Sequence, residues 1–316
     1  MEQPAARRYY VVLNPNSGTV LATGLTEQSL QAHFDDAGLD AVIDSDDTVP
    51  FGERIARAAK SDADVVVAAG GDGTITALAN ALAGSNKALA ILPLGTVNAL
   101  AKDLGLPMEV GQAVAMLRDA DIKKIDVGEV NGRVYLHKVV IGVIPSLAAA
   151  REHIRGQGTW SSKAAFMRFM FNRLVRSRRM AIAIEPEDGP SHIVRAKSVA
   201  VACNSYDQGV GKVFSRQTLD GGMLTIYTLT SLTIVDFVRL SAGMLLGNWK
   251  EAQALSIETS RAVTIRSHKK LVKVMFDGEV ETLHTPLNFK IRPGALSVLV
   301  PPDAAQEVAS VGSAAA

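Results

Sequence analysis

A glycine-rich turn after an apolar strand is the feature that most restricts what this chain can fold into. Residues 66–69 have the composition of a buried strand and run directly into Gly70-Gly71-Asp72-Gly73-Thr74, after which residues 75–82 have helical composition. Glycine lacks Cβ, so such a turn can approach a ligand closely and point successive N–H groups into one concavity. The helix N-terminus adds oriented N–H groups and a favourable dipole, so the pattern predicts a phosphate-binding unit.

The carboxylate of Asp72 adds a chemical condition to this interpretation. An anion beside a phosphate is repelled unless a cation lies between them or the anion acts as a base, so Mg²⁺ with a nucleotide is implied. The alternative is an ordinary strand-to-helix connection in which Asp72 caps the helix. Neither common nucleotide motif fits, because the turn lacks the Lys and Ser/Thr of a P-loop and does not match G-x-G-x-x-G.

Composition places the chain among globular proteins of two domains. It has 316 residues, 47% of them hydrophobic, with 33 basic and 32 acidic side chains. A net charge of +1 and 5% aromatic residues predict no nucleic-acid partner. The single cysteine, Cys203, excludes an intrachain disulfide and a thiolate zinc site. We find no leader-like segment and no apolar run long enough to cross a membrane, so we expect a cytoplasmic protein.

The first 124 residues alternate short apolar runs with helix-like stretches. Strands are expected at 9–13, 41–43, 64–69 and 88–92, and helices at 24–37, 51–59, 75–83 and 97–103. This order predicts an α/β nucleotide-binding domain over residues 1–124 with a mostly parallel sheet. Ligands of such sheets bind outside the carboxyl ends of the strands. The loops 14–18, 70–74 and 93–98 all fall at those ends.

The rest of the chain is β-rich, which predicts an antiparallel β-sandwich domain over residues 125–303. We leave open that its last strand returns to the N-terminal domain. Two helical patches interrupt the pattern, at 161–178 and 234–246, and residues 304–316 have the composition of a disordered tail. The expected strands are 125–130, 133–143, 181–184, 192–204, 224–229, 262–266, 271–276, 287–291 and 296–300.

Three further polar loops are ambiguous when each is taken alone. Residues 14–18, Asn-Pro-Asn-Ser-Gly, have the chemistry of a turn. In the loop 93–98, Thr96 could cap the following helix or donate to a ligand, and the amide of Asn98 could donate and accept at a nucleotide. Residues 276–279, Phe-Asp-Gly-Glu, read first as a hairpin turn, since Asp-Gly is a strong hairpin signal.

The helical patch at 161–178 combines basic and aromatic side chains. That combination suits an anionic membrane surface. An ordinary amphipathic helix that packs on its own sheet, with a solvated charged face, is the favoured explanation. The six histidines have no metal-ligand spacing, and we assign none of them to catalysis.

Taken together, the motifs resemble those of the diacylglycerol kinase catalytic-domain family, bacterial lipid kinases related to sphingosine and ceramide kinases. The resemblance rests on Asn-Pro-x-Ser-Gly at 14–18, the glycine turn at 70–74, Pro-Leu-Gly-Thr-x-Asn at 93–98, Leu-Gly-Leu-Pro at 104–107 and Asp-Gly-Glu at 277–279. It implies an N-terminal domain akin to NAD kinase and phosphofructokinase and a C-terminal β-sandwich. It also implies Mg²⁺-dependent transfer of the γ-phosphoryl group of ATP to a lipid hydroxyl, that of diacylglycerol or a related lipid.

The resemblance also assigns roles to residues. Asp277 would be the general base, and Asp72 would act in catalysis as a partner of Mg²⁺, directly or through water. Phosphoryl transfer needs positioning and charge neutralisation more than covalent help, so this set is chemically sufficient. The residues expected to bind the nucleotide are Asn14, Gly70, Gly71, Gly73, Thr74, Thr96, Asn98 and Glu279.

The chain departs from the family pattern on the acceptor and metal side. His137 stands where the family often has Asn, and Ile144 and Leu219 stand where it often has Asp. Two alternatives therefore stay open: a phosphotransferase for a soluble acceptor, like NAD kinase, and a nucleotide-binding regulatory protein without catalysis. We expect a lipid acceptor at a membrane surface, with peripheral association at the inner face. No protein partner is inferred, and a homodimer is left open.

Overall fold

The computed structural model describes residues 7–143, 145, 177–209, 215–231, 236, 239, 242–243, 249–251 and 254–302. The chain divides into two units, Met1–Val127 with Gly294–Ala316 (unit 1) and Gly128–Pro293 (unit 2). Ile144, the tail 304–316 and most of the helical patches at 161–178 and 234–246 lie outside the described residues. Within the described part, no helix is long and apolar enough to span a bilayer.

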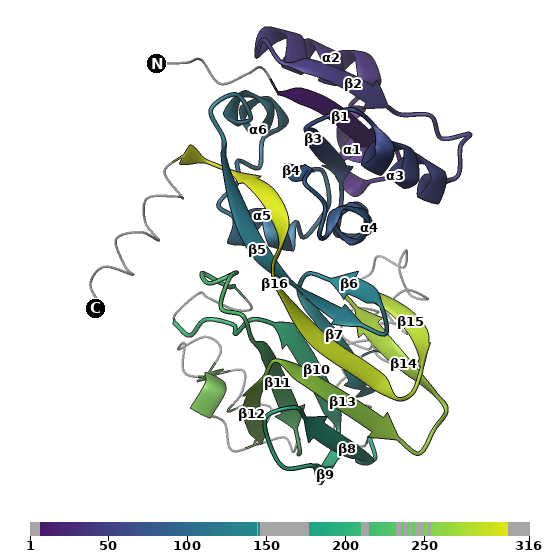
Figure 1. Ribbon diagram of the computed structural model, residues 1–316, viewed down its shortest axis with the longest axis vertical. Coiled ribbons are helices and arrows are strands. Elements are labelled where there is room, and N and C mark those ends of the chain that lie inside the picture. Colours follow the sequence, from purple (N-terminus) through teal and green to yellow (C-terminus); the bar gives the residue numbers. More distant parts are fainter. Residues whose placement is uncertain are drawn as a thin grey trace, which may run out of the picture. The chain divides into compact units, whose positions relative to one another are not determined.

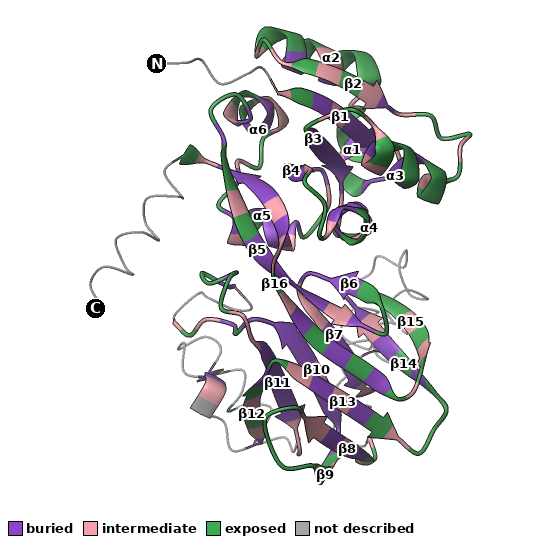
Figure 2. Cartoon of the chain, viewed as in Figure 1, coloured by how far each residue is buried: buried purple, intermediate pink, exposed green. Residues whose placement is uncertain are grey.

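Unit 1 is built on a parallel sheet in the order β2-β1-β3-β4 (Figure 1). The strands are β1 (Arg8–Leu13), β2 (Asp40–Asp44), β3 (Val65–Gly70) and β4 (Ala88–Pro93). Every residue of β3 and β4 is buried, as Figure 2 shows, because central parallel strands are covered on both faces. The predicted α/β domain with a mostly parallel sheet is confirmed.

The helices of unit 1 differ in detail from the expected ones. The helix expected at 24–37 is present but spans Glu27–Asp36, and a helix that was not expected, Gly18–Thr23, precedes it. Gly24 takes a left-handed conformation (φ 67°) and ends that first helix. Thr26 starts the second helix with a capping box to Ser29. A helix that was not expected begins after Glu109, whose side chain caps it. The helices are α1 (Gly18–Thr23), α2 (Glu27–Asp36), α3 (Phe51–Lys60), α4 (Asp72–Leu82), α5 (Ala99–Asp103) and α6 (Val110–Met116).

Unit 2 is an antiparallel β-sandwich, as the sequence predicts. One sheet has the order β12-β11-β10-β7-β14-β15, and the facing strands β16-β13-β8-β9 belong to the other sheet with the β5–β6 pair. One apolar core contains side chains of both sheets, including Tyr135, Val201 and Phe289. The strands are β5 (Asp121–Val130), β6 (Arg133–Tyr135), β7 (Lys138–Gly142), β8 (Met180–Pro186), β9 (His192–Ala196), β10 (Ser198–Cys203), β11 (Leu224–Leu229), β12 (Leu255–Ser260), β13 (Ala262–Ser267), β14 (Leu271–Phe276), β15 (Glu279–His284) and β16 (Leu287–Val300), with a 3₁₀ turn at η1 (Trp249–Glu251).

Several strand boundaries in this half correct the expectations. The run 133–143 divides into β6 and β7, because the N–H groups of residues 136–138 bind a carboxylate instead of a neighbouring strand. The run 192–204 divides at Lys197, where the chain passes from one sheet to the other. β12 and β15 were not expected, since they are half exposed and have few large apolar residues. The runs 287–291 and 296–300 form one strand, β16, which pairs with β13 and, through Ser297 and Val298, with β4.

Candidate functional site

The glycine turn of unit 1 packs directly against the loop that follows β4. A Cβ atom at Gly95 would lie 2.6 Å from the Cα of Gly71, so the two backbones are in contact. Gly70 is equally restricted, since a Cβ there would lie 2.5 Å from the Oγ1 of Thr74. Gly71 is the N-cap residue of α4, and Gly73 is exposed in the first turn of that helix. The absence of side chains at Gly70 and Gly95 is therefore a packing requirement.

The loop after β1 is fastened to the same turn. The backbone N–H of Asn14 donates to the carbonyl of Ala69 at 2.9 Å, which continues the pairing of β1 with β3. Its side-chain Nδ2 donates to the Oγ1 of Thr74 at 3.0 Å. Thr74 is 3% exposed, so this bond holds Asn14 against the start of α4. Two of the three predicted loops are thus joined by a direct side-chain contact.

Asp72 connects the third loop. Its Oδ2 accepts from the backbone N–H of Asn98 at 3.0 Å and its Oδ1 from that of Ala99 at 2.8 Å. Asp72 therefore caps α5, a helix remote in sequence, while Gly71 holds the N-cap position of α4. These N–H groups are ones that a helix start leaves without an internal partner.

Asn98, and not Thr96, occupies the N-cap position of α5. Its backbone is left-handed (φ 51°), and its side chain braces the loop, with Nδ2 donating to the carbonyls of Pro93 and Gly95. Its Oδ1 accepts from the N–H of Gly95 at 2.8 Å. Because α5 starts at Ala99, the expectation that Thr96 caps a helix starting at 97 is wrong. Thr96 is exposed, and its hydroxyl lies beside Gly18 of the loop after β1, 3.1 Å from the place of a Cβ at Gly18.

The side chains of these three loops offer one carboxylate, Asp72, as a partner for Mg²⁺. Among the described residues, no group of three or more His, Cys, Asp or Glu side chains is arranged to hold a metal ion. Mg²⁺ in nucleotide kinases is bound by one or two carboxylates, waters and substrate phosphates, so a single carboxylate satisfies the protein's share. Both oxygens of Asp72 already accept an N–H bond, which fits contact through water better than direct ligation.

In unit 2, Asp277 lies at the turn between β14 and β15 with a left-handed backbone (φ 46°). Its Oδ2 accepts from the N–H of Leu136 at 2.6 Å, and its Oδ1 accepts from those of His137 and Lys138 at 2.9 and 3.0 Å. Burial raises the pKa of the Asp277 carboxyl, while these three bonds and the charge of Arg216 act in the opposite direction. The turn is thus more than a hairpin, because it holds a carboxylate in one orientation. Glu279 follows as the first, exposed residue of β15.

A basic cluster surrounds this carboxylate. The buried guanidinium of Arg216 donates to the carbonyls of Leu136 and Cys203 at 2.6 and 2.9 Å, and its NH2 lies 3.3 Å from the Nε2 of His137. Burial, with the charge of Arg216, lowers the pKa of Lys138 to about 8 and holds that of His137 well below its ordinary value. Leu219, which stands where the family often has Asp, is 3% exposed. At this position a buried apolar side chain therefore replaces the carboxylate of the family pattern.

The predicted site residues therefore form two groups. Asn14, Gly70, Gly71, Asp72, Gly73, Thr74, Thr96 and Asn98 lie together on three contacting loops of unit 1. Asp277 and Glu279 belong to unit 2. Sequence reasoning missed Arg216 and a buried pair in unit 1, Asp44 and Arg54. Arg54 offered a usable signal, since it is a charged residue on the buried stripe of α3 beside Ile55 and Ala58.

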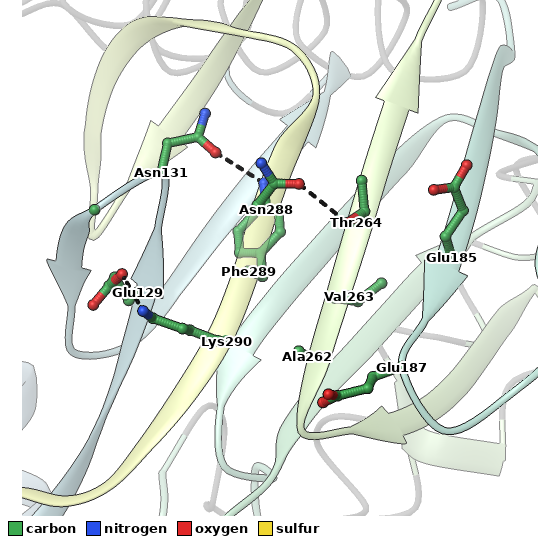
Figure 3. A pocket seen from close by; sticks show the side chains of 11 residues that line it. Glu129, Asn131, Glu185, Glu187, Ala262, Val263, Thr264, Asn288, Phe289 and Lys290 are labelled. Carbon is green, nitrogen blue, oxygen red and sulfur yellow. Dashed lines mark hydrogen bonds and ion pairs between the residues drawn. The ribbon is translucent and has the colours of Figure 1, made fainter.

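A groove of about 400 Å³ on unit 2 contains none of the predicted site residues (Figure 3). Its floor is the outer face of β13 and β16. The Thr264 hydroxyl donates to Asn288, whose N–H donates to Asn131, and Lys290 pairs with Glu129. These polar groups bind one another across the strands, so they form a solvated sheet face.

Comparison with known proteins agrees with this geometry. Residues 8–130 match the diacylglycerol kinase catalytic domain, and residues 143–300 match the YegS C-terminal NAD kinase beta sandwich-like domain. The chain belongs to the diacylglycerol kinase catalytic-domain family. The family expectation from the motifs is thereby confirmed.

Individual relatives of this lipid kinase family member span most of its length. It is 26% identical over 281 residues to "Diacylglycerol kinase" of Bacillus subtilis (strain 168), covering 86% of this chain and 90% of that protein. It is 32% identical over 240 residues to "Probable lipid kinase YegS-like" of Pseudomonas aeruginosa strain PAO1, covering 75% and 76%. A solved diacylglycerol kinase structure from Bacillus anthracis str. Sterne shares the fold, with a TM-score of 0.67 at 20% identity over 96% of this chain and 100% of that chain.

Proposed function

We propose that this kinase transfers the γ-phosphoryl group of ATP to the hydroxyl of a lipid, diacylglycerol or a related lipid, at the inner face of a membrane. The observation that carries the proposal is the fastening of three loops at the carboxyl ends of β1, β3 and β4, through the Asn14–Thr74 bond and the two N–H bonds to Asp72. Fastened in this way, the loops hold the N–H groups at the start of α4 in fixed directions, and such preorganised donors stabilise phosphate charge without reorganisation during the reaction.

On the donor side, the backbone N–H groups at the start of α4 and the Asn14 side chain bind the phosphates of ATP. The dipole of α4 favours negative charge at this end. Asp72 holds α5 in place and would be the residue that holds Mg²⁺, which would supply positive charge to neutralise the phosphates. Thr96 completes the nucleotide contacts from its exposed position, while Asn98 braces the loop that carries it. The role of Glu279 at the nucleotide stays a prediction.

On the acceptor side, Asp277 is the general base. As the lipid hydroxyl oxygen forms its bond to the γ-phosphorus, its proton passes to Asp277, and the bond between that phosphorus and the bridging oxygen breaks to release ADP. Asp277 then gives its proton to solvent. A carboxylate whose pKa is raised by burial is a stronger base, and its three backbone bonds fix its direction.

The test is transfer of radiolabelled phosphate from ATP and Mg²⁺ to diacylglycerol in mixed vesicles. We expect label in the extracted lipid and, for Asp277→Asn, a fall in kcat of at least about 100-fold. Asp188→Asn, an exposed carboxylate of unit 2, is the matched control and retains activity. Thermal unfolding and the pH dependence of kcat/KM separate loss of the base from loss of the fold.

Other results identify the alternatives. Label transferred to a soluble acceptor without vesicles would support the phosphotransferase for soluble substrates. ATP binding without turnover on any acceptor would indicate a regulatory protein. Full activity of Asp277→Asn would overturn the role of Asp277.

A further inference from the structure

A buried ion pair lies behind the loop that begins with Asn14. Arg54 in α3 and Asp44 at the end of β2 have side chains that are 3% and 4% exposed, and the Arg54 Nε lies 2.7 Å from the Asp44 Oδ1. Asp44 also accepts from the hydroxyl of Tyr10 at 3.0 Å and pairs with Arg57 at 3.3 Å. The carboxylate thus anchors groups from β1 and α3 in one place.

The same guanidinium reaches the end of β1. Its NH2 donates to the carbonyl of Leu13 at 2.8 Å and also to the carbonyl of Asp44. Leu13 is the last residue of β1, and the next residue, Asn14, makes the side-chain bond to Thr74. Hydrogen bonds therefore connect Asp44 through Arg54 to Leu13, and the backbone continues to Asn14, whose side-chain bond reaches the start of α4. All of these groups lie within unit 1.

Fold stability alone does not explain an arginine at this position. The other buried residues of α3 are Ile55 and Ala58, and apolar residues often replace a buried ion pair without loss of stability. The planar fork of arginine presents donors in fixed directions to a carboxylate and to backbone carbonyls at once, whereas lysine presents a compact point charge on a flexible stem. The position thus requires a group that binds a carboxylate and orients two strand ends simultaneously.

We propose that Arg54 is a positioning residue for the phosphate donor, which fixes the Leu13 carbonyl and so sets the place of Asn14 and its loop. This inference rests on the proposed function, because it assumes that the loop 14–18 binds ATP. Arg54 touches neither substrate, and its effect reaches the nucleotide through the backbone. Reaction geometry is sensitive to such placement, since a shift of about 1 Å can lower a rate by about 100-fold.

The test compares Arg54→Met and Arg54→Lys with Arg57→Met. Arg57 binds the same carboxylate but is 52% exposed, so it is the matched control. We expect Arg54→Met to raise the KM for ATP at least about tenfold with a smaller change in kcat, Arg54→Lys to recover little, and Arg57→Met to resemble the wild type. Hydrogen exchange of residues 14–18 should accelerate in both Arg54 variants.

The double variant Arg54→Met with Asp44→Asn separates positioning from folding. It leaves no buried unpaired charge, so its thermal stability should recover relative to Arg54→Met, while the KM for ATP stays high because the Leu13 carbonyl still lacks its donor. Recovery of the KM together with stability would overturn the proposal, as would unchanged loop exchange in a folded Arg54→Met protein. If the wild type does not use ATP, the proposed function fails, and loop exchange alone still decides whether Arg54 positions the loop.

Discussion

At the scale of single residues, the glycines of the unit 1 loops matter because they have no Cβ atom. Gly95 is not in a left-handed conformation, yet a Cβ there would lie 2.6 Å from the Cα of Gly71 and 2.7 Å from the Oδ1 of Asn98. Contacts this short are not seen for real Cβ atoms, so one of the two loops would have to move. The close approach of two backbones, and not a special φ, is what this position requires.

We predict that Gly95→Ala lowers ATP affinity at least about tenfold and destabilises the fold by about 1–3 kcal/mol, as overpacked substitutions do. Isothermal titration with ATP and urea unfolding measure the two effects. Gly52→Ala is the control, because a Cβ at Gly52 in α3 meets nothing within 4 Å. It should stabilise the protein by roughly 0.5–1 kcal/mol or leave it unchanged. Wild-type ATP affinity in Gly95→Ala would show that the contact of the loops is unimportant.

At the scale of elements, carboxylates hold together segments that the sequence separates. Asp72 caps α5 from a position 26 residues earlier, and Asp277 binds the β6–β7 turn from 141 residues beyond Leu136. The residues themselves were predictable, because they lie in polar turns after apolar strands. Their hydrogen-bond partners were not predictable, because the local sequence pattern carries no information on which distant N–H group a carboxylate binds.

We expect Asp72→Ala to loosen α5 as well as to reduce phosphoryl transfer. The N–H groups of Asn98 and Ala99 would lose their acceptor, and loss of such a cap destabilises a helix start by about 1 kcal/mol. Hydrogen exchange of residues 98–103 measures this directly and is independent of any activity. Asp119→Ala, an exposed carboxylate paired with Arg118, should not change that exchange. Equal protection of α5 in Asp72→Ala and wild type would refute the capping role.

At the scale of the whole molecule, unit 1 is completed by the last strand of the chain. Ser297 and Val298 of β16 pair with β4, and Leu299, which is 1% exposed, belongs to the same apolar cluster as Tyr9 and Phe34. The runs 287–291 and 296–300 were correctly expected to be strands. That they form one continuous strand, β16, with residues in both units depends on pairing with β13 and β4, which are distant in sequence. Unit 1 is therefore discontinuous in sequence.

We predict that Leu299→Ala destabilises unit 1 by about 2–5 kcal/mol, the usual range for emptying a buried leucine site. Urea unfolding followed by hydrogen exchange should show loss of protection in β3 and β4 before β10 and β11 are affected. Leu271→Ala, at a side chain 51% exposed in β14, should change stability by no more than about 0.5 kcal/mol. A uniform loss of protection across both units would contradict the assignment of Leu299 to the core of unit 1.

The sequence by itself determined the fold class, the glycine turn, the polar loops at the strand ends and the family, because these follow from composition, periodicity and short motifs that act locally. Tertiary structure alone decided that Asp72 caps α5, that Asp277 divides one expected strand into two, and that Arg54 reaches Leu13 across 41 residues. The physical reason is that buried charges are stable only beside specific partners, and the fold, rather than the local sequence, brings those partners together.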